Sequence, residues 1–180
     1  MGVPNGYTSA QVVQAVPTGI QSALVLISQT TTTAATQTFT NVFSATYDVY
    51  ELHIFAGVAS STQGLLLRYA NSGTPVTSGN YNFGNVRQSA GAVDAHDDAT
   101  ATSYDFMNNI SDGFCFTKMT ILNPFATAIT RAVHNSRSSA RTLVGGCTFG
   151  LTTSFDGFQL LNGNGSTFDY TTTIYGYTNS

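Results

Sequence analysis

The chain has 180 residues, of which only 8% are Asp, Glu, Lys or Arg, against about a quarter in an ordinary soluble domain. Six Lys and Arg against nine Asp and Glu give a formal net charge of −3, so the clustered cations on which nucleic-acid binding relies are absent from the sequence. Instead, 28 Thr, 17 Ser and 13 Asn supply the polarity, and the many β-branched threonines favour strands over helices.

A chain of this length is expected to form one core. The longest apolar stretch near the N-terminus, Ala23 to Ile27, is too short to span a bilayer, and no basic region precedes it. We therefore expect no membrane span, no export signal and no nucleic-acid partner.

Residues 1–21 are predicted to form an extended N-terminal arm, and residues 22–180 a β-sandwich domain. The first twenty residues contain the turn formers Pro17, Gly19 and Asn5-Gly6 around isolated apolar side chains. We interpret them as an assembly arm that docks on a neighbouring subunit, with a flexible tail as the alternative. The residues assigned to docking are Val3, Pro4, Tyr7, Val12, Val13 and Val16.

From Ser22 onward, short runs rich in β-branched and aromatic residues alternate with clusters of Gly, Asn, Ser and Thr. This pattern predicts an all-β fold in which two antiparallel sheets form a jelly-roll-like β-sandwich. The ten predicted strands are Ala23 to Gln29, Gln37 to Phe43, Val49 to Val58, Gly64 to Ala70, Tyr81 to Gln88, Phe114 to Leu122, Ile129 to His134, Leu143 to Leu151, Gly157 to Leu160 and Phe168 to Tyr177.

Period-two alternation assigns the faces of two of these strands. Tyr50, Leu52 and Ile54 are expected to face the core. In the run from Phe114 to Leu122, the face carrying Cys115, Thr117, Met119 and Ile121 is favoured as inward, which leaves Phe114 and Phe116 for a neighbour to cover. The pair Asn123-Pro124 should end that strand, and the last strand should insert into a sheet.

Two segments have little strand signal. Gly91 to Ala101 contains a third of the acidic residues and is interpreted as an exposed loop with one short helical turn, and Ser136 to Arg141 as a basic hairpin tip. Within the first segment, Asp94, His96, Asp97 and Asp98 superficially resemble a metal site. They lack the glycine and the distal glutamate of a calcium-binding hand, and only one nitrogen ligand for zinc is local, so we expect a solvated acidic loop and no metal.

The two cysteines, Cys115 and Cys147, each lie in an apolar strand-like run. Buried free thiols are the simpler interpretation and a single disulfide is the alternative.

Catalytic signals are weak. His53 lies among apolar strand residues and is interpreted as a hydrogen-bonded structural histidine, while His134 adjoins the basic tip. No G-x-S-x-G elbow or phosphate-binding loop is present. Paired carboxylates for glycoside hydrolysis would need Asp48 with Glu51, or Asp105 with Asp112, to meet by accident of folding. We expect no enzymatic activity and no cofactor.

Four segments, read in order, resemble β-sandwich domains of virion proteins from tailed bacteriophages. They are FSATYDVYEL from Phe43, GLLLRY from Gly64, TILNPF from Thr120 and the terminal TIYGY from Thr173. Such domains occur in tail fibres, head appendages and capsid decoration proteins, and the likeness covers about residues 22–180. The resemblance implies a non-enzymatic virion structural protein that forms a homo-trimer.

Among these classes we favour a capsid decoration or cement protein that binds the major capsid protein or other virion subunits on the capsid exterior. The short arm, compared with the extended stem of a long fibre, points in this direction. The alternative is a tail or fibre protein whose β-sandwich recognises a host-surface glycan, and a hydrolase built on the same fold is a third hypothesis.

Overall fold

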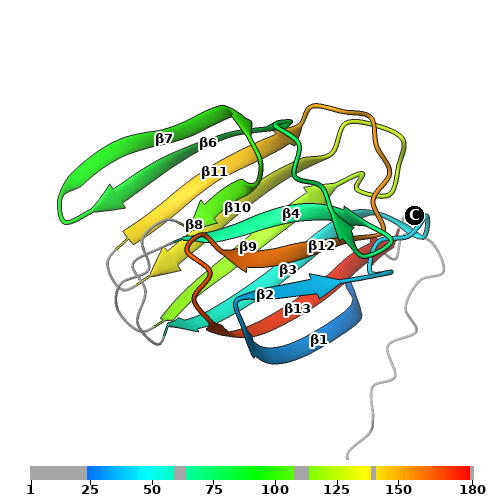
Figure 1. The fold of residues 1–180 in the computed structure, drawn as a ribbon, viewed down its shortest axis with the longest axis horizontal. Helices are drawn as coiled ribbons and strands as arrows, with labels where there is room; N and C mark the ends of the chain where they lie inside the picture. Colours follow the sequence, from blue (N-terminus) through cyan, green and yellow to red (C-terminus); the bar gives the residue numbers. More distant parts are fainter. Residues whose placement is uncertain (1–23, 59–63, 108–113, 139–140, 179–180) are drawn as a thin grey trace, which may run out of the picture.

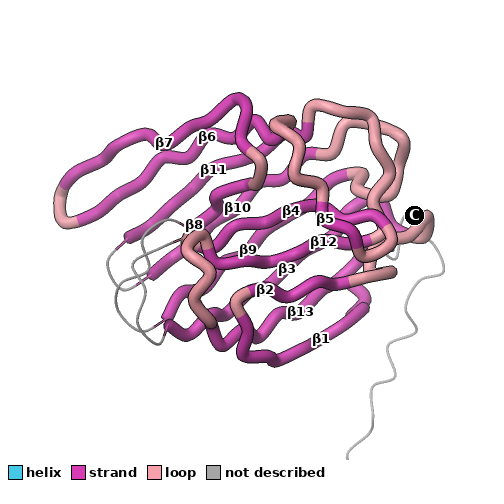
Figure 2. Tube along the Cα trace, in the orientation of Figure 1, coloured by secondary structure: helices cyan, strands magenta, loops and turns pink. Residues whose placement is uncertain are grey.

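The structure is a computed structural model that describes residues 24–58, 64–107, 114–138 and 141–178 (Figure 1). These residues form thirteen strands and no helix (Figure 2). The strands are β1 (Leu24–Ala34), β2 (Thr36–Phe39), β3 (Tyr47–Val58), β4 (Leu65–Asn71), β5 (Thr74–Pro75), β6 (Tyr81–Ser89), β7 (Ala92–Ala101), β8 (Tyr104–Met107), β9 (Phe114–Leu122), β10 (Arg131–Ser138), β11 (Arg141–Phe149), β12 (Gly157–Asn162) and β13 (Phe168–Thr178). The predicted all-β, two-sheet antiparallel sandwich is confirmed.

The strands divide into a larger and a smaller sheet. The eight-stranded sheet has the order β1-β13-β3-β9-β10-β11-β6-β7, and the five-stranded sheet has the order β2-β12-β4-β5 with β8 also paired to β4. The smaller sheet covers one face of the larger (Figure 1). We call the covered face of the eight-stranded sheet its inner face and the opposite face its outer face. The last strand, β13, lies between β1 and β3, so the expected insertion of the chain end into a sheet is confirmed.

The core between the sheets is rich in aromatic rings. Tyr69 and Phe155 stack with ring centroids 4.9 Å apart, and Tyr81 meets Phe149 edge to face at 5.0 Å. The predicted core residues of β3, Tyr50, Leu52 and Ile54, are fully buried. On β9 the predicted inward set is also buried: Cys115, Thr117, Met119 and Ile121. Alternation therefore assigned both faces correctly, because side chains on a strand point to opposite sides of the sheet.

The segment expected to be an acidic loop is a strand, so that prediction is wrong. Residues Ala92–Ala101 form β7, which pairs with β6 along nearly its whole length. The two strands are joined by Ala90 and Gly91, whose φ angles of 42° and 87° are both positive, as a type I′ two-residue hairpin turn requires. The hairpin brings β7 to the edge of the larger sheet, where its charged side chains stay solvated.

The remaining differences are local. The tip expected at Ser136 to Arg141 is mostly strand, because β10 continues to Ser138 and β11 begins at Arg141. The short strands β5 and β8 were not predicted. Strand β9 ends at Leu122, directly before Asn123-Pro124, as expected. The predicted arm, including Val3, Pro4, Tyr7, Val12, Val13 and Val16, lies outside the described residues.

Candidate interaction surface

The outer face of the eight-stranded sheet carries most of the exposed apolar side chains. Ten large hydrophobic residues are exposed among the described residues, and all but Phe125 and Leu151 lie on this face. The eight on the outer face are Leu24, Leu26, Phe55, Val86, Val93, Phe114, Val133 and Val144. Scattered single hydrophobic residues are normal on a protein surface, but a set gathered on one face marks a candidate contact area.

Strand register places these residues in rows that cross the sheet. Residues directly opposite one another on paired strands share a face. One row runs from His53 on β3 through Lys118 and Asn135 to Val144 and Val86. The next row, nearer the N-terminal end of β9, includes Phe55 and Phe116, whose ring centroids lie 4.7 Å apart. The expectation that Phe114 and Phe116 lie on the face opposite the core is confirmed.

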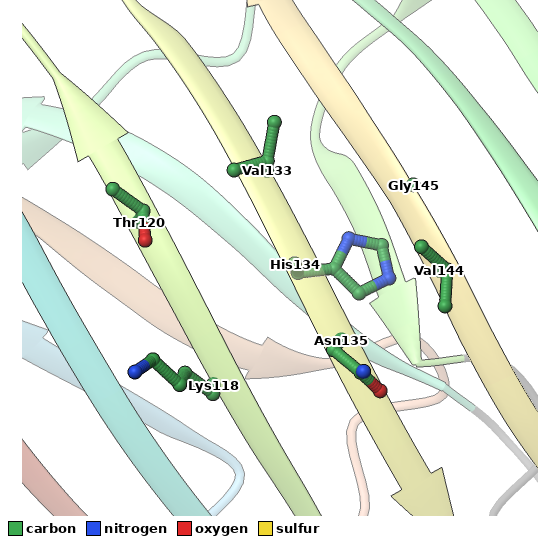
Figure 3. Close-up of a pocket in the computed structure, with 7 residues that line it drawn as sticks. All are labelled: Lys118, Thr120, Val133, His134, Asn135, Val144 and Gly145. Carbon is green, nitrogen blue, oxygen red and sulfur yellow. The ribbon is translucent and has the colours of Figure 1, made fainter.

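Two shallow hollows interrupt the rows, and Val133 lines both of them. The first, of about 500 Å³, lies over Lys118, Thr120, Asn135 and Val144, with β10 and β11 forming its floor (Figure 3). The second, of about 340 Å³, lies over Gly84 and Gly146, two paired glycines that place no side chain on the outer face. A Cβ atom added at Gly84 would meet nothing within 4 Å, so this hollow is open surface above the sheet.

A buried carboxylate lies on the outer face, on β3, the third strand of the larger sheet. Glu51, the only glutamate in the chain, is 4% exposed. Its Oε1 accepts a hydrogen bond from His53 Nε2 at 2.7 Å, and its Oε2 accepts from Lys118 Nζ and from the Tyr177 hydroxyl, each at 2.9 Å. The interpretation of His53 as a hydrogen-bonded structural histidine is confirmed.

These contacts shift the protonation equilibria of the cluster. Burial by itself raises the pKa of Glu51, but the hydrogen bonds from Lys118, His53 and Tyr177 outweigh it and hold this pKa below its ordinary value. The hydrogen bond to Glu51 raises the pKa of Lys118, and the hydrogen bond to the same carboxylate raises the pKa of Tyr177. The cluster is therefore a neutralised ion pair, with Glu51 ionised and Lys118 protonated at neutral pH.

The residues considered as metal ligands are not gathered. Because β7 is a strand, His96 and Asp97 point to opposite faces. Asp94 forms a bidentate ion pair with Arg87, and His96 Nε2 lies 3.0 Å from Asp105 Oδ2. The part of the chain that the structure describes contains no group of three or more His, Cys, Asp or Glu residues that could hold a metal ion.

His134 lies in the core, where sequence reasoning had placed it only beside a basic tip. Its Nδ1 is hydrogen-bonded with the Tyr104 hydroxyl, and its buried Nε2 has no hydrogen-bond partner. Burial lowers the pKa of His134 to about 4, so the ring is neutral at physiological pH. Ala132, His134 and Ser136 share the inward face of β10, but only Ala132 is apolar, so the sequence pattern did not reveal it.

Both cysteines are free and buried, which confirms the thiol interpretation. The carboxylate pairs considered for glycoside hydrolysis are not assembled among the described residues: Glu51 points to the outer face, while Asp48 lies at the start of β3 with the parity of the inner face. Asp112 lies outside the described residues. Within those ranges, neither His53 nor His96 is hydrogen-bonded to a serine or threonine hydroxyl.

The described residues contain no helix long and apolar enough to cross a membrane. Comparison with known proteins found no matching protein family, no matching curated protein and no matching solved structure.

Proposed function

We propose that this chain is a non-enzymatic structural protein of a bacteriophage virion, and that it acts as a capsid decoration or cement protein. The single observation that supports the proposal most is the outer sheet face, which carries eight exposed hydrophobic residues together with a charge cluster that is already neutralised. Such a face is suited to covering another protein surface, because interface cores are depleted in unpaired charge. The virion context comes from the resemblance of the sequence segments.

The mechanism that we propose depends on contact area. Many modest contacts, repeated by the symmetry of a shell, add up to strong binding through avidity. Residues 1–21 are proposed to anchor the protein on the major capsid protein or another virion subunit. A homo-trimer, which the resemblance implies, belongs to the same proposal.

The first test is location. Gold-labelled antibodies against the purified protein, applied to virions of the phage that encodes it, are expected to label the capsid exterior. Labelling confined to the tail would replace the cement proposal with the receptor-binding alternative, and binding to a glycan array would then identify the ligand class. Absence of the protein from washed virions would overturn both.

The second test concerns the arm. The full chain carrying Val12→Asp, Val13→Asp and Val16→Asp is expected to lose binding to capsids that lack the protein, because charges replace the apolar anchor. The matched control carries Thr8→Asp and Thr18→Asp, which add charge to the same segment without removing an apolar side chain. Equal binding by both variants and by the unmodified chain would refute the anchoring role.

A further inference from the structure

We propose that the outer face of the eight-stranded sheet binds a second copy of this chain, sheet against sheet. The inference deepens the proposed function and rests on it only for the biological setting of the assembly. The area of the face, the distribution of its charges and its relief support this pairing.

The area of the face meets the requirement of a stable interface. Eight strands at about 4.8 Å spacing, each with about ten residues rising about 3.4 Å, give a face of roughly 1,300 Å². A specific protein interface of standard size buries about 800 Å² on each partner. Coverage of most of this one face by a second copy is therefore sufficient, with no contribution from the rest of the molecule.

The charges on the face favour a partner that is itself neutral. Among the described residues, the outer face carries three cationic side chains and three acidic ones. The cations are Lys118, Arg131 and Arg137, and the acids are Glu51, Asp97 and Asp169. A strongly acidic or basic partner gains no net attraction from such a face, whereas a second copy meets no net repulsion.

Several of these charges are also satisfied within the face. Lys118 pairs with Glu51, Arg137 donates a hydrogen bond to the Thr142 hydroxyl, and Asp169 accepts one from the Thr33 hydroxyl. Removing water from charges that already have hydrogen-bond partners costs less than burying free ones. Covering the face with a second copy, which carries the same balanced charges, is thus compatible with its electrostatics.

The relief of the face is self-complementary. Val133, which is 56% exposed, stands between the hollow over Lys118 and Thr120 and the hollow over Gly84 and Gly146. Val133 therefore forms an apolar ridge beside the first recess, whose lining it shares with Val144 (Figure 3). When two copies of the patch meet about a two-fold axis, Val133 of each can enter a recess of the other, as a symmetric interface requires. This two-fold contact is additional to the three-fold contacts of the proposed homo-trimer.

The test measures the mass of the full chain in solution by sedimentation equilibrium over a range of concentrations. The unmodified chain is expected to sediment as an assembly of two or more chains, and Val133→Lys is expected to weaken its association at least tenfold. Gly84→Leu fills the second hollow from a position where an added Cβ meets nothing within 4 Å, so it should fold normally and weaken association as well.

The matched control is Leu151→Lys, at an exposed hydrophobic residue in the loop after β11. This substitution should leave the mass unchanged, and circular dichroism verifies that all three variants are folded. A monomeric unmodified chain, or an assembly that resists both Val133→Lys and Gly84→Leu, would overturn the proposal. A monomer that still labels the capsid exterior would overturn self-association alone, whereas an assembly absent from virions would overturn the proposed function alone.

Discussion

Acidification is expected to destabilise the protein through His134, beginning below the ordinary histidine pKa of about 6.5. The imidazole ring is buried beside Tyr104 and Phe106, with ring centroids 5.4 and 6.3 Å away. Burial lowers its pKa from 6.5 to about 4. A proton on this ring would place a positive charge in the core, where Nε2 has no hydrogen-bond partner.

The sign and size of the effect follow from this pKa. Between the two pKa values the unfolded chain binds a proton that the folded chain does not, so the free energy of unfolding decreases as the pH falls. One unit of pKa shift corresponds to about 1.4 kcal/mol. Integration from pH 7 gives a loss of about 2 kcal/mol by pH 5 and about 3 kcal/mol by pH 4 from this residue alone.

Urea denaturation of the unmodified chain and of His134→Gln, at pH 7 and pH 5 and equal protein concentration, measures this difference. The substitution itself is expected to lower stability at pH 7, because it disturbs the packing around Tyr104. The decisive quantity is the change between the two pH values, which should be smaller by about 2 kcal/mol in the variant. The other histidines and the carboxylates are common to both proteins and cancel. An equal pH dependence in the two proteins would refute the reasoning.

Three further predictions concern other sites. Glu51→Gln removes the ionic acceptor of Lys118, His53 and Tyr177 and should lower the free energy of unfolding at pH 7 by about 1–3 kcal/mol. Because the folded pKa of Glu51 is lowered, this stabilisation is present above the ordinary glutamate pKa, and the difference in stability between the variant and the unmodified chain should shrink at pH 3. A difference that stays constant between pH 7 and pH 3 would contradict the ion-pair explanation. Gly157→Ala places a Cβ against the backbone carbonyl of Phe39 and should cost more than 2 kcal/mol in a urea titration, on the order of a severe core substitution, while Gly150→Ala, whose Cβ makes only an ordinary 3.5 Å contact, should cost far less. Burial raises the pKa of Cys115 and Cys147 to about 12, so a thiol reagent at pH 8 should find no reactive thiol in the native protein and two after unfolding; rapid native labelling would show that the thiols are accessible.

The faces of the central strands could be predicted because burial follows a local rule. On β3 every second residue from Tyr50 to Ala56 is apolar, and on β9 the same holds apart from Thr117, so the period indicates which side meets the core without knowledge of the partner strand. The same rule applies to β10, but there Ser136 and His134 occupy inward positions. Polar residues at core positions hide the period, and the environment of His134 was missed for this reason.

Strand β7 could not be predicted from its composition. Its side chains are mostly exposed, since the β6–β7 hairpin projects beyond the smaller sheet (Figure 1), and an edge strand of this kind needs no apolar face. What makes it a strand is its hydrogen bonding to β6 through the turn at Ala90 and Gly91. Ala-Gly is a weaker hairpin signal than the Asn-Gly or Asp-Gly pairs that favour this turn type.

The cluster around Glu51 forms only when β3, β9 and β13 pair in the correct register, and its contacts in turn stabilise that register. The buried inner face already disfavours a one-residue slip of these strands, and the cluster adds a second restraint on the outer face. Glu51 on β3 binds Lys118 on β9 and Tyr177 on β13, so it joins three adjacent strands through one carboxylate. A slip of one residue in either neighbour would turn Lys118 or Tyr177 to the opposite face and leave the carboxylate without that donor. Because charged residues are scarce in this sequence, the only glutamate in the chain has few alternative cationic partners. Its ion pair with Lys118 therefore favours one strand register over the others.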